Sequence, residues 1–443
     1  MVTVIYSTHY RRNTRYYQGA DVMVYVISIE GKPLMPTSNA KARKLLKQKK
    51  AKVIKREPFT IKLLYKTTSY TQALIHGVDT GSGYIGSAVV DSNNNNVVYL
   101  SQIEIRNDIA DRMTQRRKYR RNRRSRKTRY RKARWLNRRN SIKKDRFSPT
   151  MTSKINSHLK EINYVKSILP ITQLILETGT FDTHLLKNPK LKYNKWGYQK
   201  GDNYGFANVK AYVLTRDNYT CQHCKGKSKN NKLEVHHIIY RSNGGGDEQE
   251  NLITLCSSCH YKIHHNQIKL NLKGKKKSQL KYATQMNSIR VQLLKQLECE
   301  ETFGFITKEN RYKMNLPKEH YMDAVAIASQ GNKVKFKTNY VLFKKCVADG
   351  DYQQTKGIRS EQRIPTCKIN GFRKFDKVEY LGSEYFIKGR MSTGYAILMN
   401  IHGEKINFKD APKGFKTPKM TNLRRVGSRK SWIISQQIIP NIC

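Results

Sequence analysis

The chain has 443 residues and carries 86 Lys and Arg against 32 Asp and Glu, a formal net charge of +54 at pH 7. This length allows about two to four domains. The basic surplus is spread along most of the sequence, and 38% hydrophobic residues are left for packed cores, so we expect a folded protein that binds a polyanion. We find no apolar run long enough to span a bilayer and no lipidation signal, which favours nucleic acid over a membrane surface as the partner.

The N-terminal part predicts a small α/β module. The apolar residues 22–29 are typical of a strand, Thr37 to Asn39 offer helix caps, and residues 40–48 follow as a basic helix. A second extended run is expected over residues 59–65.

A short proline-bounded run lies between the strand and the helix: Pro33, Leu34, Met35 and Pro36. The basic stretch around it resembles the N-terminal domain of the IscB proteins, which is named for a PLMP signature. IscB proteins are transposon-encoded, RNA-guided nucleases and relatives of the CRISPR type II effectors. The resemblance covers most of the chain. It is weakest in the C-terminal part and at residues 1–19, to which we assign no role.

Three strands are expected next, over residues 74–79, 84–91 and 97–105, and turns join them. Asp79 ends the first strand. A meander of this kind resembles the opening of an RNase H-like nuclease, although an aspartate at a strand end is by itself more often a turn former.

The most basic segment runs from Arg112 to Arg139, with 16 Lys or Arg among 28 residues and no acid. Because Pro and Gly are absent from it, one helix of about 42 Å is expected, and its like charges would destabilise that helix without a polyanion. A solvated basic tail is the alternative interpretation. The segment resembles the bridge helix of the IscB family, which implies nucleic-acid contacts by its arginines. These are Arg116, Arg117, Arg120, Arg121, Arg123, Arg124, Arg126, Arg129, Arg131 and Arg134.

Further acids follow the same pattern as Asp79. An apolar strand over residues 174–177 ends in Glu177, and far downstream His320 and Asp323 lie one turn apart on an expected helix. Each acid alone is more often structural, but the three carboxylates in this order could together hold two Mg²⁺ ions across a scissile phosphate. The set resembles that of a split RuvC nuclease, and the resemblance implies that His320 activates or positions water.

Two Cys-x-x-Cys pairs bracket a segment that contains adjacent histidines and a glycine-rich turn. Thiolates at this spacing face one Zn²⁺ from a tight turn, and two pairs complete a closed, structural site. Disulfides are the alternative, but no secretory segment accompanies the cysteines, which favours a reducing compartment. The expected ligands are Cys221, Cys224, Cys256 and Cys259.

Between the two pairs, residues 233–239 predict a strand and residues 243–249 a loop, and a helix is expected after Cys256. His236 and His237 are adjacent on the strand, so they point to opposite faces and are expected to do different work. One of them would hold a metal while the other handles a proton.

The order His237, Asn251, His260 resembles the motif of the HNH nucleases, which have a ββα-metal fold. The resemblance implies that His237 is the general base that activates water, that His236 and His260 ligate Mg²⁺, and that Asn251 fixes the loop that orients His237. His264, one helical turn past His260, competes for the last ligand position. A zinc-ribbon binding module with incidental histidines is the alternative.

Near the C-terminus, short alternating strands are expected over residues 377–380, 385–388 and 395–399, separated by glycines, and they predict a small β-barrel. The resemblance implies that this part contacts guide RNA and reads a short motif beside the DNA target. Arginines that read guanine would be the physical expectation. The arginines of this part fit phosphate equally well, so their assignment stays open.

Together these patterns predict an α/β protein: an RNase H-like (RuvC) core with an inserted ββα-metal HNH domain, an arginine-rich bridge helix and a C-terminal small β-barrel. The expected parts, in chain order, are an N-terminal PLMP-type domain (1–65), RuvC-like part I (70–110), the bridge helix (111–146), RuvC-like part II (150–195), the HNH domain (205–268), RuvC-like part III (280–345) and the C-terminal β domain (350–443).

The resemblance implies an RNA-guided, Mg²⁺-dependent endonuclease that cuts double-stranded DNA. Its HNH site would cut the guide-paired strand and its RuvC-like site the displaced strand. We expect a monomer with its guide RNA, in the prokaryotic cytoplasm close to the nucleoid. Two rivals remain. A guide-free HNH endonuclease would cut without RNA, and a non-catalytic nucleic-acid-binding protein would bind without cutting.

Overall fold

The computed structural model describes residues 23–127, 147–201, 203–227, 229–270, 272, 274, 280–348, 368–408, 411–412 and 414–438. The predictions for residues 1–19 and for residues 128–146 of the bridge helix lie outside this described part. The chain divides into two compact units. Unit 1 comprises the described residues up to Gly179 and from Ile289 on, and unit 2 comprises Thr180–Ser288.

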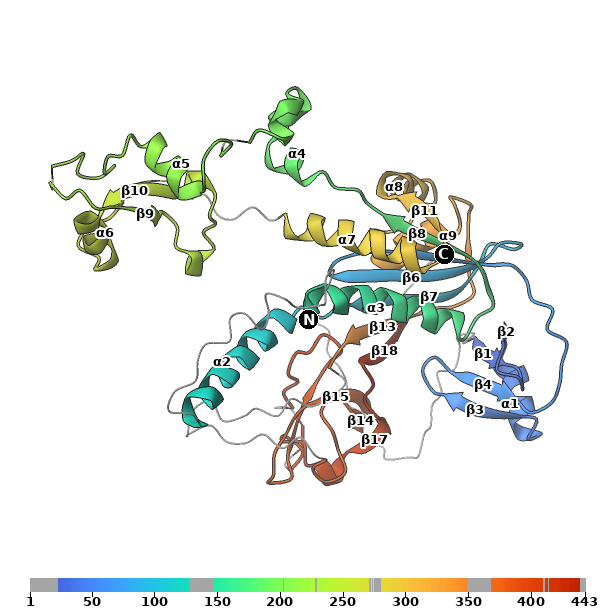
Figure 1. The fold of residues 1–443 in the computed structure, drawn as a ribbon. Coiled ribbons are helices and arrows are strands. Elements are labelled where there is room, and N and C mark those ends of the chain that lie inside the picture. Colours follow the sequence, from blue (N-terminus) through green and yellow to red (C-terminus); the bar gives the residue numbers. More distant parts are fainter. Residues whose placement is uncertain are drawn as a thin grey trace. The chain divides into compact units, whose positions relative to one another are not determined.

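A four-stranded sheet in the order β2-β1-β4-β3 opens unit 1 (Figure 1). The predicted α/β module is confirmed, and the PLMP run itself forms strand β2. Ser38 caps the basic helix, because its side chain accepts a hydrogen bond from the Lys41 backbone N–H. The elements are β1 (Val24–Ile27), β2 (Pro33–Thr37), α1 (Asn39–Lys47), β3 (Ala51–Lys55) and β4 (Thr60–Leu63).

An eight-stranded mixed sheet forms the centre of unit 1, with the path β11-β8-β5-β6-β7-β13-β18 and β12 paired to β7. The predicted meander is confirmed, since β5, β6 and β7 pair antiparallel, and β8 joins β5 in parallel. The strands are β5 (Leu74–Asp79), β6 (Tyr84–Asp91), β7 (Asn96–Glu104), β8 (Ile171–Thr178), β11 (Glu300–Phe303), β12 (Lys335–Phe336), β13 (Tyr340–Cys346) and β18 (Trp432–Ile438).

Hydrophobic clusters cover both faces of this sheet. Side chains alternate along a strand, so Val89 of β6 belongs to one cluster and its neighbour Ala88 to the other. The first cluster is closed by Tyr25 of β1 and by the C-terminal end of α3, and the second by α9. The Tyr25 hydroxyl donates to the Val98 carbonyl at 3.0 Å. Besides α1, the helices that lie wholly in unit 1 are α2 (Ile109–Lys127), α3 (Pro149–Lys166), α8 (Gly304–Lys313) and α9 (His320–Ala328).

The C-terminal strands were predicted to close into a barrel, and the described residues do not do so. The described residues form an open four-stranded sheet in the order β16-β15-β14-β17, whose edges are β16 and β17, in place of the expected barrel. Short strands between glycine turns predict antiparallel neighbours, but they carry no signal for closure. The chain then returns to the central sheet, where β18 pairs with β13. The strands are β14 (Lys377–Tyr380), β15 (Ser383–Arg390), β16 (Ala396–Met399) and β17 (Arg424–Gly427), and a 3₁₀ turn covers Met420–Asn422.

Unit 2 is built around an antiparallel hairpin of β9 and β10, against which α6 packs through a small core that includes the four cysteines. Leading into it are two short helices and two 3₁₀ turns, and α7 leads back toward unit 1. The elements are α4 (Thr183–Lys187), η2 (Pro189–Lys192), η3 (Lys195–Tyr198), α5 (Val209–Arg216), β9 (Leu233–His237), η4 (Arg241–Asn243), η5 (Gln249–Asn251), β10 (Leu252–Cys256), α6 (Ser257–His264) and α7 (Lys281–Gln296).

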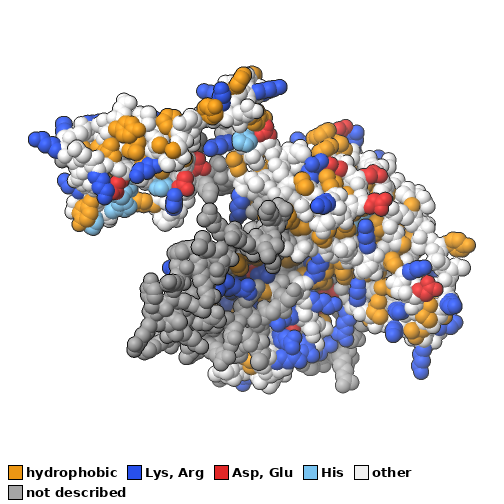
Figure 2. Space-filling view, viewed as in Figure 1, with side chains coloured by type: hydrophobic (Ala, Val, Ile, Leu, Met, Phe, Trp, Pro, Cys, Tyr) orange, Lys and Arg blue, Asp and Glu red, His pale blue; other side chains and the backbone are white. Residues whose placement is uncertain are grey.

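The surface of both units is basic. Figure 2 shows Lys and Arg side chains spread over the visible face, with few Asp and Glu between them. No helix of the described residues is both long and apolar enough to cross a bilayer.

Candidate functional site

Two neighbouring strands of the central sheet bring two of the predicted acids together. β5 and β8 run parallel, and Asp79 lies opposite Glu177 in their register. Asp79 is the last residue of β5 and Glu177 the last but one of β8, so both carboxylates lie at the same end of the sheet. This arrangement joins residues that are far apart in the sequence, as the three-acid prediction requires.

Helix α9 brings the other two predicted residues, because glycines let it lie unusually close to the sheet. A Cβ atom added to Gly86 would stand 1.8 Å from the His320 carbonyl oxygen, and one added to Gly77 would stand 2.4 Å from the Ala324 oxygen. As a result, His320 Nδ1 lies 2.6 Å from Asp79 Oδ2. Sequence reasoning missed these glycines, although a glycine inside a strand signals close backbone approach.

The electrostatics of this acidic site favour a cation. Burial and the negative charges of Asp79 and Asp323 raise the pKa of Glu177 to about 7. Burial and Asp79 also raise the pKa of Asp323, while its ion pair with Arg311 (Nε to Oδ1, 2.8 Å) opposes that rise. The hydrogen bond to Asp79 raises the pKa of His320. Carboxylates that repel one another in a partly buried site are typical of metal-assisted phosphate chemistry.

The structure therefore places the four predicted residues of the acidic site together, with one difference in detail. Asp79 and His320 are in contact, and Glu177 is adjacent to Asp79. Asp323 instead pairs with Arg311 of α8, a partner that sequence reasoning did not name. The ring of Tyr84 stacks on that of His320, with the centroids 5.4 Å apart and the planes at 18°.

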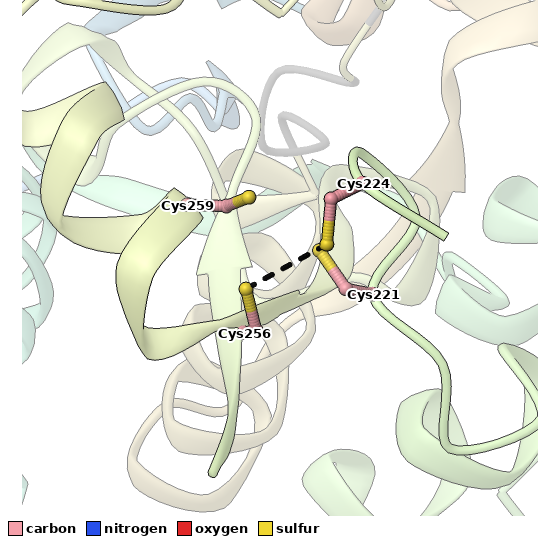
Figure 3. Close-up of side chains that lie close together, drawn as sticks. All are labelled: Cys221, Cys224, Cys256 and Cys259. Atoms are coloured by element: carbon pink, nitrogen blue, oxygen red, sulfur yellow. Dashed lines mark hydrogen bonds between the residues drawn. The ribbon is translucent and has the colours of Figure 1, made fainter. Parts of the chain in front are cut away.

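The four predicted zinc ligands of unit 2 also come together. Their Sγ atoms all lie within 4.8 Å of one another, and the side chains of Cys221, Cys224, Cys256 and Cys259 converge in Figure 3. None of the four forms a disulfide, so the disulfide alternative is not what the structure shows. Burial and the neighbouring sulfurs raise the pKa of Cys259, which is the repulsion that a bound dication would remove. Four converging thiols fit a structural Zn²⁺.

The histidines form a second cluster beside the cysteines. His236 of β9 and the helical pair His260 and His264 place a ring nitrogen each within 4.8 Å of one another. His264, the competing candidate, thus belongs to the cluster together with both expected ligands. Burial, followed by its histidine neighbours, lowers the pKa of His236 to about 4, so that ring is neutral and free to ligate. Glu234 Oε2 lies 2.8 Å from His260 Nδ1, a typical outer partner of a ligating imidazole.

The donor set of this histidine cluster does not match the expected metal. Mg²⁺ is bound by oxygen ligands, whereas three imidazole nitrogens suit a transition metal such as Zn²⁺, Ni²⁺ or Co²⁺. The residues present therefore fit a borderline divalent metal, and the assignment of Mg²⁺ to His236 and His260 is not supported by their chemistry.

His237 points away from this cluster, as expected for adjacent residues on a strand. Its Nε2 lies 2.8 Å from Asp247 Oδ1, and Arg241 Nη2 lies 2.7 Å from the same oxygen. Asp247 was not predicted, although an acid directly after the glycine-rich turn was a visible signal. A carboxylate on one nitrogen of an imidazole fixes its orientation and its tautomer.

Asn251 fastens the loop that carries Asp247. Its buried amide donates to the Ile239 and Gly246 carbonyls at 3.0 and 2.9 Å, and its Oδ1 accepts from the Ile239 N–H at 2.9 Å. Gly245 permits this closure, because a Cβ there would stand 1.8 Å from the Ile239 oxygen. Asn251 thus orients the loop beside His237 through backbone contacts.

Two surfaces carry residues suited to nucleic acid. Helix α2 begins at Ile109 rather than at Arg112, and the side chains of Arg123, Arg124 and Arg126 lie outside the described part, as do residues 129, 131 and 134. The predicted arginines that are described, Arg116, Arg117, Arg120 and Arg121, are all exposed.

The second such surface is the segment around α4 in unit 2, where Figure 2 shows basic and hydrophobic side chains side by side. Its rings of Tyr193, Trp196 and Tyr204 are largely exposed, and Lys200 Nζ lies 5.1 Å from the Trp196 ring centroid and 5.4 Å from that of Tyr204. Exposed rings interleaved with lysines are typical of surfaces that stack on bases.

Two family models match the chain. The RRXRR protein family matches residues 24–201, which include β5, α2 and β8, and the HNH endonuclease family matches residues 221–266, which include the cysteine and histidine clusters. Their order agrees with the PLMP run and with an HNH domain that follows Glu177. The chain is an IscB-like protein. This IscB-like protein therefore contains an HNH endonuclease domain.

Curated relatives match mainly short stretches of the IscB-like chain. The type IV methyl-directed restriction enzyme EcoKMcrA of Escherichia coli strain K12 is 38% identical over 65 residues, 13% of this chain and 23% of the enzyme. Anaredoxin of Nostoc sp. strain PCC 7120 is 33% identical over 69 residues, 16% of this chain and 88% of that protein. The chain thus spans less than a quarter of the restriction enzyme.

Solved structures similar to the IscB-like chain include Streptococcus thermophilus Cas9. The crystal structure with the AGAA PAM matches at 13% sequence identity and a TM-score of 0.29, covering 54% of this chain and 32% of that chain. The structure with the GGAA PAM matches at the same identity and TM-score, covering 55% and 32%.

Proposed function

We propose that this IscB-like protein is an RNA-guided DNA endonuclease with two separate cutting sites. The observation that carries the proposal is the presence, in one chain, of an HNH endonuclease domain and of a second, acidic site at which Asp79, Glu177 and His320 meet. Two sites suit a substrate with two strands, and the exposed arginines of α2 suit the phosphates of a bound nucleic acid.

In the HNH domain, the proposal assigns His237 as the general base and Asp247 as the residue that orients it. His237 accepts a proton from the attacking water, whose oxygen forms a new bond to phosphorus while the bond to the leaving oxygen breaks. The leaving oxygen takes a proton from solvent. A divalent metal held by the histidine cluster would supply charge stabilisation to the phosphate. Zn²⁺ on the four cysteines would hold the domain together.

In the acidic site, the proposal assigns Asp79, Glu177 and Asp323 as the ligands of Mg²⁺, which suits their oxygen donors. His320 is hydrogen-bonded to Asp79 and stacks on Tyr84. The proposal assigns it to position or deprotonate the attacking water. Arg311 holds Asp323 in place through their ion pair.

The guide is the proposed source of sequence selection. A bound RNA would select the target by base pairing, while the protein contacts the backbone and reads a short flanking motif. Arginines of the C-terminal sheet remain candidates for that motif, although Arg424 pairs with Glu379 and Arg425 donates to the Gly371 carbonyl.

The test is strand-resolved cleavage by the protein with its co-purified RNA and a matching duplex. His237→Ala is expected to abolish cutting of the guide-paired strand alone, and Asp79→Ala cutting of the displaced strand alone. Loss of both cuts in either variant would contradict the assignment of two independent sites. Cutting of the same duplex by RNA-free protein would instead indicate a guide-free nuclease.

A further inference from the structure

The end of strand β11 and the start of helix α8 each carry a phenylalanine beside the acidic site, Phe303 and Phe305. Strand β11 pairs in parallel with β8, so that Thr302 lies opposite Glu177 and Phe303 opposite Thr178. Helix α8 begins at the next residue, Gly304. A Cβ atom added to Gly304 would stand 3.0 Å from Glu177 Oε1, so the backbone between the two phenylalanines lies against one of the proposed metal ligands.

The rings of Phe303 and Phe305 lie parallel and exposed. Their centroids are 6.2 Å apart, with the planes within 4° of each other. Phe303 is 37% exposed and Phe305 is 71% exposed. Single apolar residues are common on protein surfaces, but two parallel rings beside a partly buried polar site form an ordered apolar surface that indicates a ligand.

The groups around the rings suit a nucleic-acid strand. The nearby acids are engaged by other side chains, since Glu301 accepts from Arg290 at 2.7 Å and Glu300 accepts from Gln173 at 2.7 Å. A planar base offers a π face of the size of a phenyl ring, and stacking on an aromatic side chain is tolerant of sequence. The rings therefore match a base, and a cation held by the acidic site beside them would contact its phosphate.

We propose that Phe303 and Phe305 stack on an unpaired base of the strand that is cut in the acidic site and thereby position that strand for cutting. In a duplex, both faces of each base are covered by its neighbours. A base in a displaced strand is free to leave its stack and lie on the rings. The inference rests on the proposed function, because it assumes that the acidic site cuts DNA.

The first test measures binding without cutting. Single-stranded DNA oligonucleotides carrying one 2-aminopurine, placed in turn at successive positions, are mixed with the protein in Ca²⁺ in place of Mg²⁺. Stacking on the rings predicts fluorescence quenching at one or two positions. That quenching is retained in Phe305→Trp and lost in Phe305→Leu. Tyr282→Ala, which removes an exposed ring from α7, is the matched control and should behave as the unmodified protein. Equal quenching in Phe305→Leu and in the unmodified protein would overturn the proposal.

The second test measures cutting by the protein with its RNA on a matched duplex. Phe305→Leu is expected to slow cutting of the displaced strand about tenfold and to leave the guide-paired strand unchanged, because stacking of one base is lost. Removing one base of the displaced strand should give the same loss in the unmodified protein and no further loss in Phe305→Leu. Equal slowing of both strands would show a structural role and overturn the proposal. If RNA-dependent cutting itself is absent, the proposed function fails, while the quenching test still decides the stacking.

Discussion

His320 Nδ1 lies 2.6 Å from Asp79 Oδ2, although 241 positions separate the two residues in the sequence. The contact exists because α9 crosses β5 and β6 at backbone distance, over Gly77 and Gly86. A histidine and an acid that meet in this way give the acidic site its geometry, and the glycines beneath the helix are part of that site.

A substitution at Gly86 should therefore disturb the geometry of the acidic site, although none of the acidic residues is mutated. In Gly86→Ala, the added methyl group would overlap the His320 carbonyl, so α9 must shift away from β6. Such overpacking costs about 1–3 kcal/mol of stability. We expect loss of displaced-strand cutting with the guide-paired strand still cut. Gly83→Ala is the matched control, because nothing lies within 4 Å of a Cβ at Gly83. Unchanged cutting in Gly86→Ala would contradict this account of the site.

The cysteine cluster should hold one zinc ion per chain. Cys256→Ser removes one of four converging thiolates, so we expect the purified variant to lose that zinc and its HNH domain to become sensitive to protease. Metal analysis by mass spectrometry checks the first expectation and limited proteolysis the second. Cys299→Ser, outside the cluster, is the control. Full zinc content in Cys256→Ser would show that the cluster is not a metal site.

The histidine cluster should prefer a transition metal to Mg²⁺. His264→Ala leaves two of three imidazoles, and we expect about a 10- to 100-fold loss of Ni²⁺ or Co²⁺ affinity, measured by calorimetry. Cutting of the guide-paired strand should weaken in parallel. His265→Ala is a close control, because His265 lies against Tyr261 and not in the cluster. If His264→Ala cuts that strand in Mg²⁺ as fast as the unmodified protein does, the three-histidine assignment is contradicted.

Two buried histidines, His76 and His158, should each lower the stability of the protein as the pH is lowered below neutrality. Burial lowers the pKa of His76 to about 3 and that of His158 to about 4, from 6.5 in both cases. Below pH 6.5 the unfolded chain takes up protons that the folded chain does not, so the free energy of unfolding decreases as the pH falls. Each histidine contributes up to about 1.4 kcal/mol per pH unit.

Urea unfolding between pH 4.5 and 7.5 measures this slope. His158→Gln should make it shallower by up to about 1.4 kcal/mol per pH unit, because one titrating group is removed. His402→Gln, at an exposed position, is the control. A slope that is equal in His158→Gln and in the unmodified protein would show that His158 is not held neutral in the folded state.

Local patterns predicted much of this structure. Apolar runs between turn residues gave β5 and β6 with the observed ends, and an acid at the end of an apolar strand located both Asp79 and Glu177. The cysteine spacing predicted a cluster that the structure assembles. These features depend on a few neighbouring residues, which is why the sequence reveals them.

Other features depend on contacts between distant residues. Nothing local in Trp432–Ile438 indicates that it pairs with β13, or that the C-terminal sheet lies between these two strands in the chain. Arg311 becomes a partner of Asp323 only when α8 packs on α9. Asp247 joins His237 through a loop whose path is set by Asn251. Such partners follow from tertiary packing and not from spacing.

The central claim is that a bound RNA directs this nuclease, and the RNA that co-purifies with the protein tests it most directly. The protein is purified without nuclease treatment, and its RNA is sequenced. The account predicts one discrete, structured RNA with a variable segment, and cutting only of DNA that matches this segment. Heterogeneous or absent RNA, with DNA still cut, would contradict RNA guidance.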